Sequence, residues 1–510
     1  MTRRYHTKRN ALLLLIANGL GSILGLIRSF YILRVLLPSS YGIWSLVSTL
    51  LGYANYADMG VNTGFILEVP KLIGQGLLDE AQRVQRQAFT AILGICSVLF
   101  CGLVLVTFLP IHFGVTRVTL LIVAVSIMVT AFLNYYSVVA RIQDNYWLIG
   151  LSTLVMASVS TVGIILVSSL SHDLRVESVA LISVLGSMMA VLLLGRAMHV
   201  HPAWPPNWSD WLRLAKLGLP VSLVPIAFTL FQSVDRWVVA ALVPTSTMGY
   251  YGLGTTLGLF LYMIPNTLAT VLFTRQIEHM GATGNPRSSE PLVLPPLQMS
   301  GYIMALVSGG AVLSIPFFIR YVAPNYLPGT SAAIFQVIGN CFLFAVPIST
   351  QILASVNKIM LVFCTLFIGL LLEVGLVALL VRSTLGIDGA ALAVMFSDAI
   401  YSIVITYLVM RLFDATIRGQ LGRVLSCFLP FAISLPLAIF LLAQTPMTGV
   451  LWNDTIRLGM AGTTYVLIST LLLVLCMRVT GLIIPDYVKG SIGEWLPARL
   501  ATLLNLKEKP

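Results

Sequence analysis

The stretch GLIRSFYILRVLLP, from Gly25 to Pro38, places two arginines in a segment that is otherwise lipid-soluble. It continues a run from Ala11 to Gly25 that carries no charged residue. An apolar segment of this length is typical of a membrane-spanning helix. An arginine near the bilayer centre costs about 2.5–3.5 kcal/mol on insertion scales, so it normally faces a cavity or a partner. The rest of the chain indicates which of these applies.

The composition indicates a membrane protein throughout. The chain has 510 residues, of which 58% are hydrophobic and 10% are charged. Soluble domains contain about 45–50% apolar and about 25% charged residues. The hydrophobic residues form blocks of about 20–27 residues, long enough to cross a hydrocarbon core of about 30 Å. The sequence therefore predicts an all-α polytopic membrane protein.

Hydrophobic blocks separated by polar segments predict about fourteen transmembrane helices. The first block is read as a retained span, because it is long and no small-residue cleavage site follows it. The predicted spans are 11–37, 43–67, 88–109, 117–140, 146–170, 177–198, 214–243, 248–273, 298–322, 331–353, 358–381, 388–410, 423–443 and 455–478.

The distribution of positive charge predicts the orientation. With the N-terminus in the cytoplasm, and with residues at the ends of spans counted in the adjoining segments, 22 of the 30 Lys and Arg residues fall in cytoplasmic segments, five fall on the opposite face and three lie deeper inside spans. Such an asymmetry is the positive-inside pattern. Both termini are thus expected in the cytoplasm, in a bacterial inner membrane. The net charge of +11 reflects this topology and contact with anionic lipids, and it requires no nucleic-acid surface.

A weak internal repeat suggests two related halves. LLPSSYGIWSL (36–46) follows the first span and LVPTSTMGYYGL (242–253) follows the seventh, and two further similarities keep the same order and offset. An even number of spans in each copy predicts parallel repeats with a substrate site between them.

The repeat predicts the domain division. Residues 1–198 are expected to form an N-terminal six-helix bundle and 199–213 an interfacial linker. Residues 214–422 would form a second six-helix bundle with a trailing loop. Residues 423–510 would add two transmembrane helices and an interfacial tail.

Three arginines lie inside predicted spans. Arg34 lies four residues before Pro38, about 6 Å along a helix, where its side chain could reach the outer headgroups. Arg28 lies about 15 Å deep, and Arg236 has a similar depth on the equivalent span of the second half. Two interpretations stay open: a cationic patch in a central cavity, or a salt bridge between the halves, for example from Arg28 to Asp235.

Four carboxylates also lie inside predicted spans. Asp58 is flanked by Asn, Tyr and Gly residues, which favours a helix that lines water. Asp235 precedes Arg236 and must point in a different direction on a helix. Glu373 and Asp398 either bind a coupling proton or cation, or pair with a polar neighbour. No cluster of residues predicts a metal site or a cofactor.

The stretch RSFYILRVLLPSSYGIWSLVSTLLGYANYADMGVNTGF (28–65) resembles the opening of the O-antigen and polysaccharide-unit flippases. These belong to the multidrug/oligosaccharidyl-lipid/polysaccharide exporter superfamily. The similar features are an Arg in the first span, a Pro–small–small–aromatic–Gly turn, and a helix that ends in Asp58-Met59-Gly60. The length, the fourteen spans and the repeat also fit this family.

The resemblance implies a flippase that moves undecaprenyl-diphosphate-linked oligosaccharides to the outer leaflet for surface polysaccharide assembly. Arginines suit this substrate, because the guanidinium fork matches phosphate oxygens. Arg28, Arg236 and Arg34 are the candidates, with polar groups of spans 1, 2, 7 and 8 facing the sugars. A polysaccharide polymerase and chain-length machinery are the possible protein partners.

Other functions remain open. A lipid II flippase or a cation-coupled drug exporter of the same superfamily would share the fold, although an exporter of cations favours a carboxylate-rich cavity. A membrane-embedded glycan polymerase or ligase would be an enzyme, but the longest outer connection here has only about eleven residues (444–454). The sequence also lacks Walker A, GxSxG and HExxH motifs. A transporter rather than an enzyme is therefore expected.

Overall fold

The computed structural model describes residues 2–108, 116–170, 176–198, 200, 202–203, 205–283, 290–414 and 416–479. Within these ranges, side chains are described except at 2–15, 170, 270–283, 291–292 and 474–479. The described residues are almost all helical and contain no β-strand. They form two compact units, Met1–Gly252 and Leu253–Pro510, and the division falls inside a helix.

The first unit contains nine α-helices and ends within a tenth. In chain order they are α1 (Thr2–Val35), α2 (Pro38–Tyr53), the 3₁₀ turn η1 (Ala54–Tyr56), α3 (Val61–Gly74), α4 (Leu78–Phe108), α5 (Arg117–Ile142), α6 (Tyr146–Leu170), α7 (Val176–Met198), α8 (Trp208–Phe231), α9 (Val234–Leu242) and the start of α10 (Thr245–Thr283).

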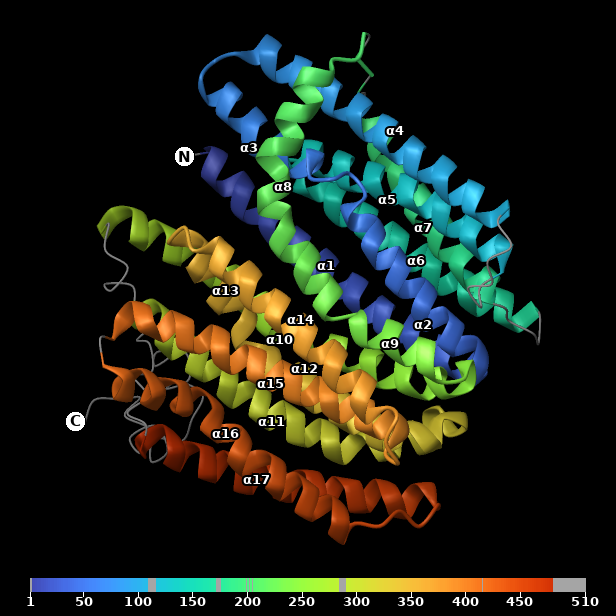
Figure 1. Ribbon diagram of the computed structural model, residues 1–510, viewed down its shortest axis with the longest axis vertical. Coiled ribbons are helices and arrows are strands. Elements are labelled where there is room, and N and C mark those ends of the chain that lie inside the picture. Colours follow the sequence, from blue (N-terminus) through green and yellow to red (C-terminus); the bar gives the residue numbers. More distant parts are fainter. Residues whose placement is uncertain are drawn as a thin grey trace. The chain divides into compact units, whose positions relative to one another are not determined.

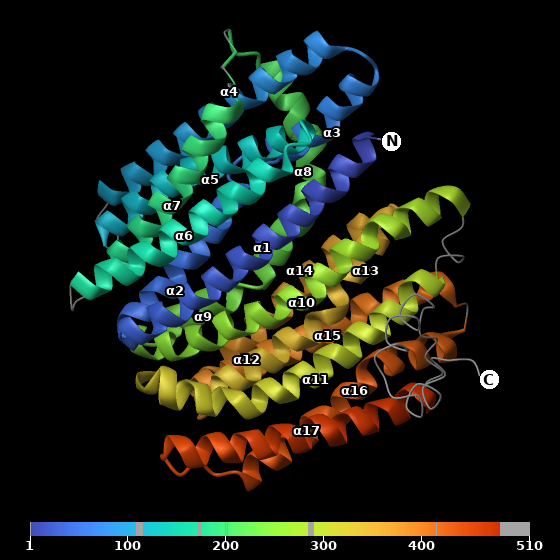
Figure 2. The ribbon, with the colours of Figure 1, turned by 180° about the vertical axis from the view of Figure 1, so that it is seen from behind.

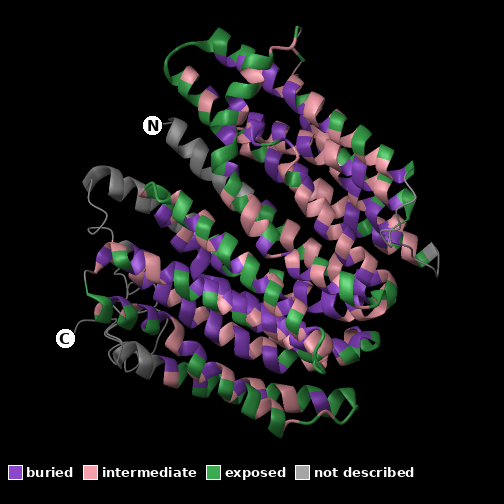
Figure 3. Cartoon of the chain, viewed as in Figure 1, coloured by how far each residue is buried: buried purple, intermediate pink, exposed green. Residues whose placement is uncertain are grey.

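The second unit holds the rest of α10 and seven further α-helices. These are α11 (Glu290–Val322), η3 (Pro324–Gly329), α12 (Thr330–Phe342), η4 (Leu343–Ala345), α13 (Val346–Ser355), α14 (Ile359–Leu380), α15 (Gly386–Phe413), α16 (Ile417–Gln444) and α17 (Leu451–Val479). Within this unit α16 and α17 lie beside α11 (Figure 2). Buried residues concentrate on α12 and α15 (Figure 3), which form the centre of the unit.

The predicted all-α polytopic fold is confirmed. In the part of the chain that is described, twelve segments are long and apolar enough to cross a membrane. The two remaining predicted spans are also helical. One, 43–67, is interrupted between α2 and α3, and the other, 248–273, lies within the 39-residue α10.

The seventh span, α8 and α9, lies in the first unit and packs against α2 and α3 (Figure 1). Side-chain hydrogen bonds join these two antiparallel segments along most of their length. They link Tyr53 to Ser233 (2.7 Å), Tyr56 to Thr229 (3.1 Å) and Thr63 to Ser222 (2.8 Å).

Glycines make this close packing possible. Gly64 faces the backbone of Leu214, and Gly218 faces the backbone of Gly60, so that a methyl group at either glycine would overlap a carbonyl oxygen. Gly60 also has φ +83°, a left-handed conformation that side chains rarely adopt. The chain therefore brings α3 and α8 into backbone contact at residues that only glycine can occupy.

The starts of α2 and α10 pack on each other through glycines. A methyl group at Gly42 would overlap the carbonyl oxygen of Thr245, and one at Gly249 would overlap that of Pro38. Pro38 and Gly42 lie in the first turns of α2, and Thr245 and Gly249 lie in the first turns of α10. The two segments of the repeat motif are therefore in backbone contact, although the motif aligns Pro38 with Pro244 rather than with Thr245.

Candidate functional site

A polar cavity of about 520 Å³ lies within the first unit. Five helices and one 3₁₀ turn supply its walls. The lining residues are Arg28 from α1, Leu51 and Gly52 from α2, Asn55 from η1, Ser126, Val129, Thr130, Leu133, Asn134 and Ser137 from α5, Ser152, Thr153, Met156 and Ser160 from α6, and Ser183, Val184 and Ser187 from α7. The lining contains one cationic side chain and no carboxylate.

Most hydroxyl groups in the lining donate to carbonyls of their own helix. Ser137 donates to the carbonyl of Leu133 (2.7 Å), Ser152 to that of Ile149 (2.8 Å) and Thr153 also to Ile149 (3.0 Å). These oxygens keep lone pairs that can accept from a ligand. The hydroxyl of Ser160 is buried and has no protein partner among the described residues. The wall thus offers many weak polar contacts, as a polyhydroxy ligand requires.

Arg28 is the charged residue of this cavity. Its side chain is half-buried, and its Nε is shielded from solvent without a hydrogen-bond partner among the described residues. No described carboxylate lies within ion-pair distance of its guanidinium group. A cation inside a membrane protein is costly unless it has a partner or water. Arg28 therefore has the position expected of a residue that binds an anionic group.

The packing of α1 against α6 holds Arg28 in place. Gly21 lies against the Thr153 side chain, and a methyl group there would come within 3.2 Å of it. Further along, the Thr161 hydroxyl donates to the carbonyl of Leu24 (3.2 Å), and Ser168 donates to the Tyr31 hydroxyl (2.8 Å). These contacts lie on both sides of Arg28 and set the face that α1 presents to the cavity.

Asp58 does not line the cavity, although the sequence favoured a position facing water. It is 6% exposed, and its carboxylate accepts the backbone N–H of Asn62 (2.7 Å). This bond satisfies a free N–H in the first turn of α3, directly after the left-handed residues Met59 and Gly60. The Asp-x-Gly motif therefore interrupts the second span and restarts it against α8.

Asp235 and Arg236 bond to different partners, and Asp235 makes no ion pair with Arg28. Asp235 is buried and accepts from the Tyr251 hydroxyl (2.6 Å). Arg236 is also buried, and it donates to the Thr49 hydroxyl (2.7 Å) and to the carbonyl of Gln232 (3.1 Å). These bonds hold α9 against α2 and α10. The suggested ion pair between Arg28 and Asp235 is absent from the described residues.

The other predicted site residues lie elsewhere. Arg34 is exposed near the end of α1 and is not part of the cavity wall. Glu373 on α14 and Asp398 on α15 are buried in the second unit. Gly339 packs against the Asp398 carboxylate, since a methyl group at Gly339 would lie 3.0 Å from its Oδ2.

The polar wall formed by α5, α6 and α7 was not predicted from the sequence. Polar groups of spans 1, 2, 7 and 8 were expected to face a substrate, whereas those of the seventh span bond to α2, η1 and α3. The sequence does contain a pattern that indicates this wall. Polar residues recur every four positions on the mostly apolar α5, at Ser126, Thr130 and Asn134. Such spacing places them on one face of the helix.

No family model and no curated protein sequence matches the chain. Solved structures do match it. A multidrug resistance MATE family transporter of the MOP superfamily in an inward-facing conformation is 14% identical, with a TM-score of 0.63 over 77% of this chain and 94% of that one. The lipid II flippase MurJ in an inward closed conformation is 16% identical, with a TM-score of 0.65 over 91% of this chain and 98% of that one. An outward-facing MATE transporter is 14% identical, with a TM-score of 0.55 over 80% of this chain and 95% of that one.

At such low identity these similarities concern the fold alone. They agree with the helical architecture described above and extend over most of each chain. The protein therefore has the all-α, polytopic fold of the MOP-superfamily transporters.

Proposed function

We propose that the protein is a flippase for undecaprenyl-diphosphate-linked oligosaccharides in the bacterial inner membrane. It would move them from the inner to the outer leaflet by alternating access of two helical bundles, for surface polysaccharide assembly. The observation that carries the proposal is Arg28, a cation with no counter-ion among the described residues, in a cavity lined by hydroxyl and amide groups.

The chemistry of the cavity suits both ends of such a headgroup. A guanidinium group binds phosphate oxygens through parallel, charge-assisted hydrogen bonds. The Ser, Thr and Asn side chains of α5, α6 and α7 offer exchangeable partners for sugar hydroxyls. The lipid tail would remain in the bilayer while the headgroup moves.

A drug exporter that binds cations is the second candidate, because MATE transporters share the fold. The cavity argues against it, since its one charged lining residue is positive. A lipid II flippase is closer, because lipid II also carries a diphosphate and MurJ shares the fold. We favour the oligosaccharide substrate on the resemblance of residues 28–65 to polysaccharide-unit flippases. A polysaccharide polymerase and chain-length machinery are then the proposed partners.

We place energy coupling in the second unit. Glu373 and Asp398 are its deeply buried carboxylates on α14 and α15. A proton or a cation that binds at either carboxylate would change the charge inside the second unit. Arg34, Arg236, Asp58 and Asp235 are not needed for this scheme, and the last three have the packing roles described above.

Reconstituted transport tests the proposed function. We expect proteoliposomes containing the purified protein to make a polyprenyl-diphosphate oligosaccharide accessible to a membrane-impermeant glycosidase from the opposite leaflet. Empty liposomes provide the baseline, and lipid II and a cationic dye serve as alternative substrates. Faster transport of lipid II would reassign the protein as a lipid II flippase, and transport of the dye alone would make it a drug exporter.

The orientation is also testable. The charge distribution predicts that reporter fusions after Leu78 and Thr283 have cytoplasmic activity and that one after Ser383 has periplasmic activity. A paired phosphatase and fluorescent-protein reporter reads both sides independently. Periplasmic activity at Thr283 would contradict the even number of spans before it.

A further inference from the structure

A second cavity lies at the end of the first unit that the charge distribution assigns to the cytoplasm. Its volume is about 940 Å³. One wall is the start of α4, and the other is the connection between α7 and α8. This connection, called the strap, comprises the described residues 202–203 and 205–207. Its lining includes Asp79, Arg83, Arg86, Gln87, Pro205 and Trp208.

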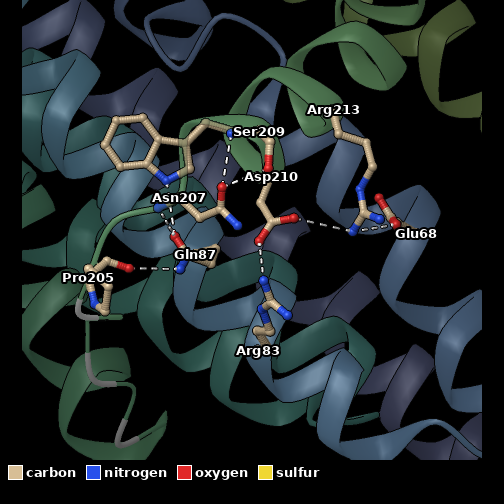
Figure 4. Close-up of polar contacts among 9 residues, drawn as sticks. Glu68, Arg83, Gln87, Pro205, Asn207, Ser209, Asp210 and Arg213 are labelled. Atoms are coloured by element: carbon tan, nitrogen blue, oxygen red, sulfur yellow. Dashed lines mark hydrogen bonds and ion pairs between the residues drawn. The ribbon is translucent and has the colours of Figure 1, made fainter.

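The strap is fixed to α4 by a buried glutamine. Gln87 donates to the carbonyl of Pro205 (3.2 Å), and its Oε1 accepts from the Asn207 N–H (3.1 Å) and from the Trp211 indole (3.2 Å), as Figure 4 shows. Thr90 holds the other end, since its hydroxyl oxygen accepts the N–H of Ala203 (2.8 Å). The cavity is therefore built into the fold by contacts to both sides of the strap.

The charge of this cavity is predominantly positive. Arg86 is exposed and makes no ion pair with a described acidic residue. Arg83 contacts Asp210 at 3.3 Å, but its side chain remains 62% exposed, and Asp210 also lies 3.9 Å from Arg213. Arg213 itself pairs with Glu68 (2.9 Å; Figure 4). Among the described lining residues one is acidic, Asp79, and two are basic, Arg83 and Arg86.

The surroundings indicate a membrane surface. Trp208 lines the cavity and is 73% exposed at the start of α8, where a membrane span begins. Tryptophan is enriched at the headgroup level of bilayers, and basic pockets on the cytoplasmic side bind the headgroups of anionic lipids. We propose that this cavity binds the phosphate of an anionic phospholipid of the inner leaflet, with Arg86 and Arg83 as its ligands and Trp208 beside its acyl chains.

The site is distinct from the Arg28 cavity and does not depend on the proposed function. Arg83 and Arg86 lie on α4, whereas the walls of the Arg28 cavity come from α1, α2, α5, α6, α7 and η1. Anionic lipid bound here would tie the strap, and with it the start of α8, to the membrane surface. Headgroup binding would then stabilise the contact between α4 and α8 in the first unit.

Thermal unfolding of the purified protein in detergent, with added lipid, tests the proposal. We expect phosphatidylglycerol to raise the unfolding midpoint and phosphatidylcholine to have no such effect. A basic residue near the surface contributes about 1 kcal/mol, so Arg86→Gln should require about fivefold more phosphatidylglycerol for half the effect. Arg141→Gln, which removes another exposed arginine of the same unit, should leave the dependence unchanged. The proposal would be overturned if Arg86→Gln and Arg141→Gln required the same phosphatidylglycerol concentration for half the effect. It would also be overturned if soluble glycerol phosphate protected the protein as well as phosphatidylglycerol does.

A spectroscopic measurement covers the case in which Arg86→Gln lowers stability by itself. In phosphatidylcholine bilayers that contain a minor fraction of brominated lipid, brominated phosphatidylglycerol should quench Trp208 more than brominated phosphatidylcholine does. The Trp208 signal is the difference between the wild type and Trp208→Phe. We expect Arg86→Gln to remove the preference for phosphatidylglycerol. Quenching that is the same for both lipids in the wild type would exclude the site.

Discussion

Replacement of Arg28 by alanine is expected to abolish surface-glycan export while the protein accumulates at its wild-type level. Arg28 has no protein counter-ion in the described part of the chain, so its removal strands no buried carboxylate. The substrate, in contrast, loses charge-assisted hydrogen bonds to its diphosphate. Such bonds are worth about 1.5–3 kcal/mol each, which predicts a loss of transport of at least about tenfold.

Arg28→Lys separates charge from geometry. Lysine keeps the positive charge but cannot present two parallel donors to phosphate oxygens. We therefore expect activity between those of the wild type and Arg28→Ala. Arg196→Ala is the matched control, because it removes an exposed arginine of the same unit that does not line the cavity. Export and abundance should be measured for all three variants in the same strain.

A salt bridge between Arg28 and Asp235 predicts a different outcome. In that case Arg28→Ala would lower abundance, and the double variant with Asp235→Asn would restore both abundance and export. The structure gives Asp235 its own donor, the Tyr251 hydroxyl. We expect the double variant to export no better than Arg28→Ala. Full export by the double variant would refute a phosphate-binding role for Arg28.

Hydropathy was sufficient to predict the fold class, but not the interruptions of the helices. Pro220 and Pro225 lie inside α8 and Pro265 lies inside α10, so these prolines do not mark where a span is interrupted. The seventh span breaks instead at Gln232 and Ser233, and the second span breaks at Asp58 to Gly60. The break at Asp58 to Gly60 is held by the bond from the Asn62 N–H to the Asp58 carboxylate and by backbone packing against α8, and this packing exists only in the folded structure.

A predicted depth does not give the direction of a side chain. Arg28 and Arg236 were expected at similar depths on equivalent spans, yet one lines a cavity and the other bonds to Thr49. Thr49 is 187 residues away from Arg236 in the chain, so no local pattern relates them. The assignment of α8 to the first unit likewise depends on distant pairs such as Thr63 and Ser222.

The packing of α8 on α3 leads to the strongest prediction about stability. Gly218→Ala adds one methyl group, which would overlap the carbonyl oxygen of Gly60 and approach the backbone N of Gly64. Backbone atoms cannot rotate away as a flexible side chain can, so the two helices must separate. Overpacking of this kind typically costs about 1–3 kcal/mol, and separation would also weaken the hydrogen bonds between the two spans. We expect a lower unfolding midpoint and a several-fold lower abundance in the membrane.

Two further alanine variants test whether overlap with backbone atoms causes the loss of stability. Gly64→Ala places its methyl group against the carbonyl oxygen of Leu214 and should destabilise the protein in the same way. Gly74→Ala, at the end of α3, meets no atom within 4 Å and should behave as the wild type. Because alanine is the better helix former, a general effect of glycine replacement would stabilise all three variants. Wild-type abundance of Gly218→Ala and Gly64→Ala would show that α8 does not pack on α3 in the membrane, and that the seventh span belongs with the second bundle, as the repeat alone suggests.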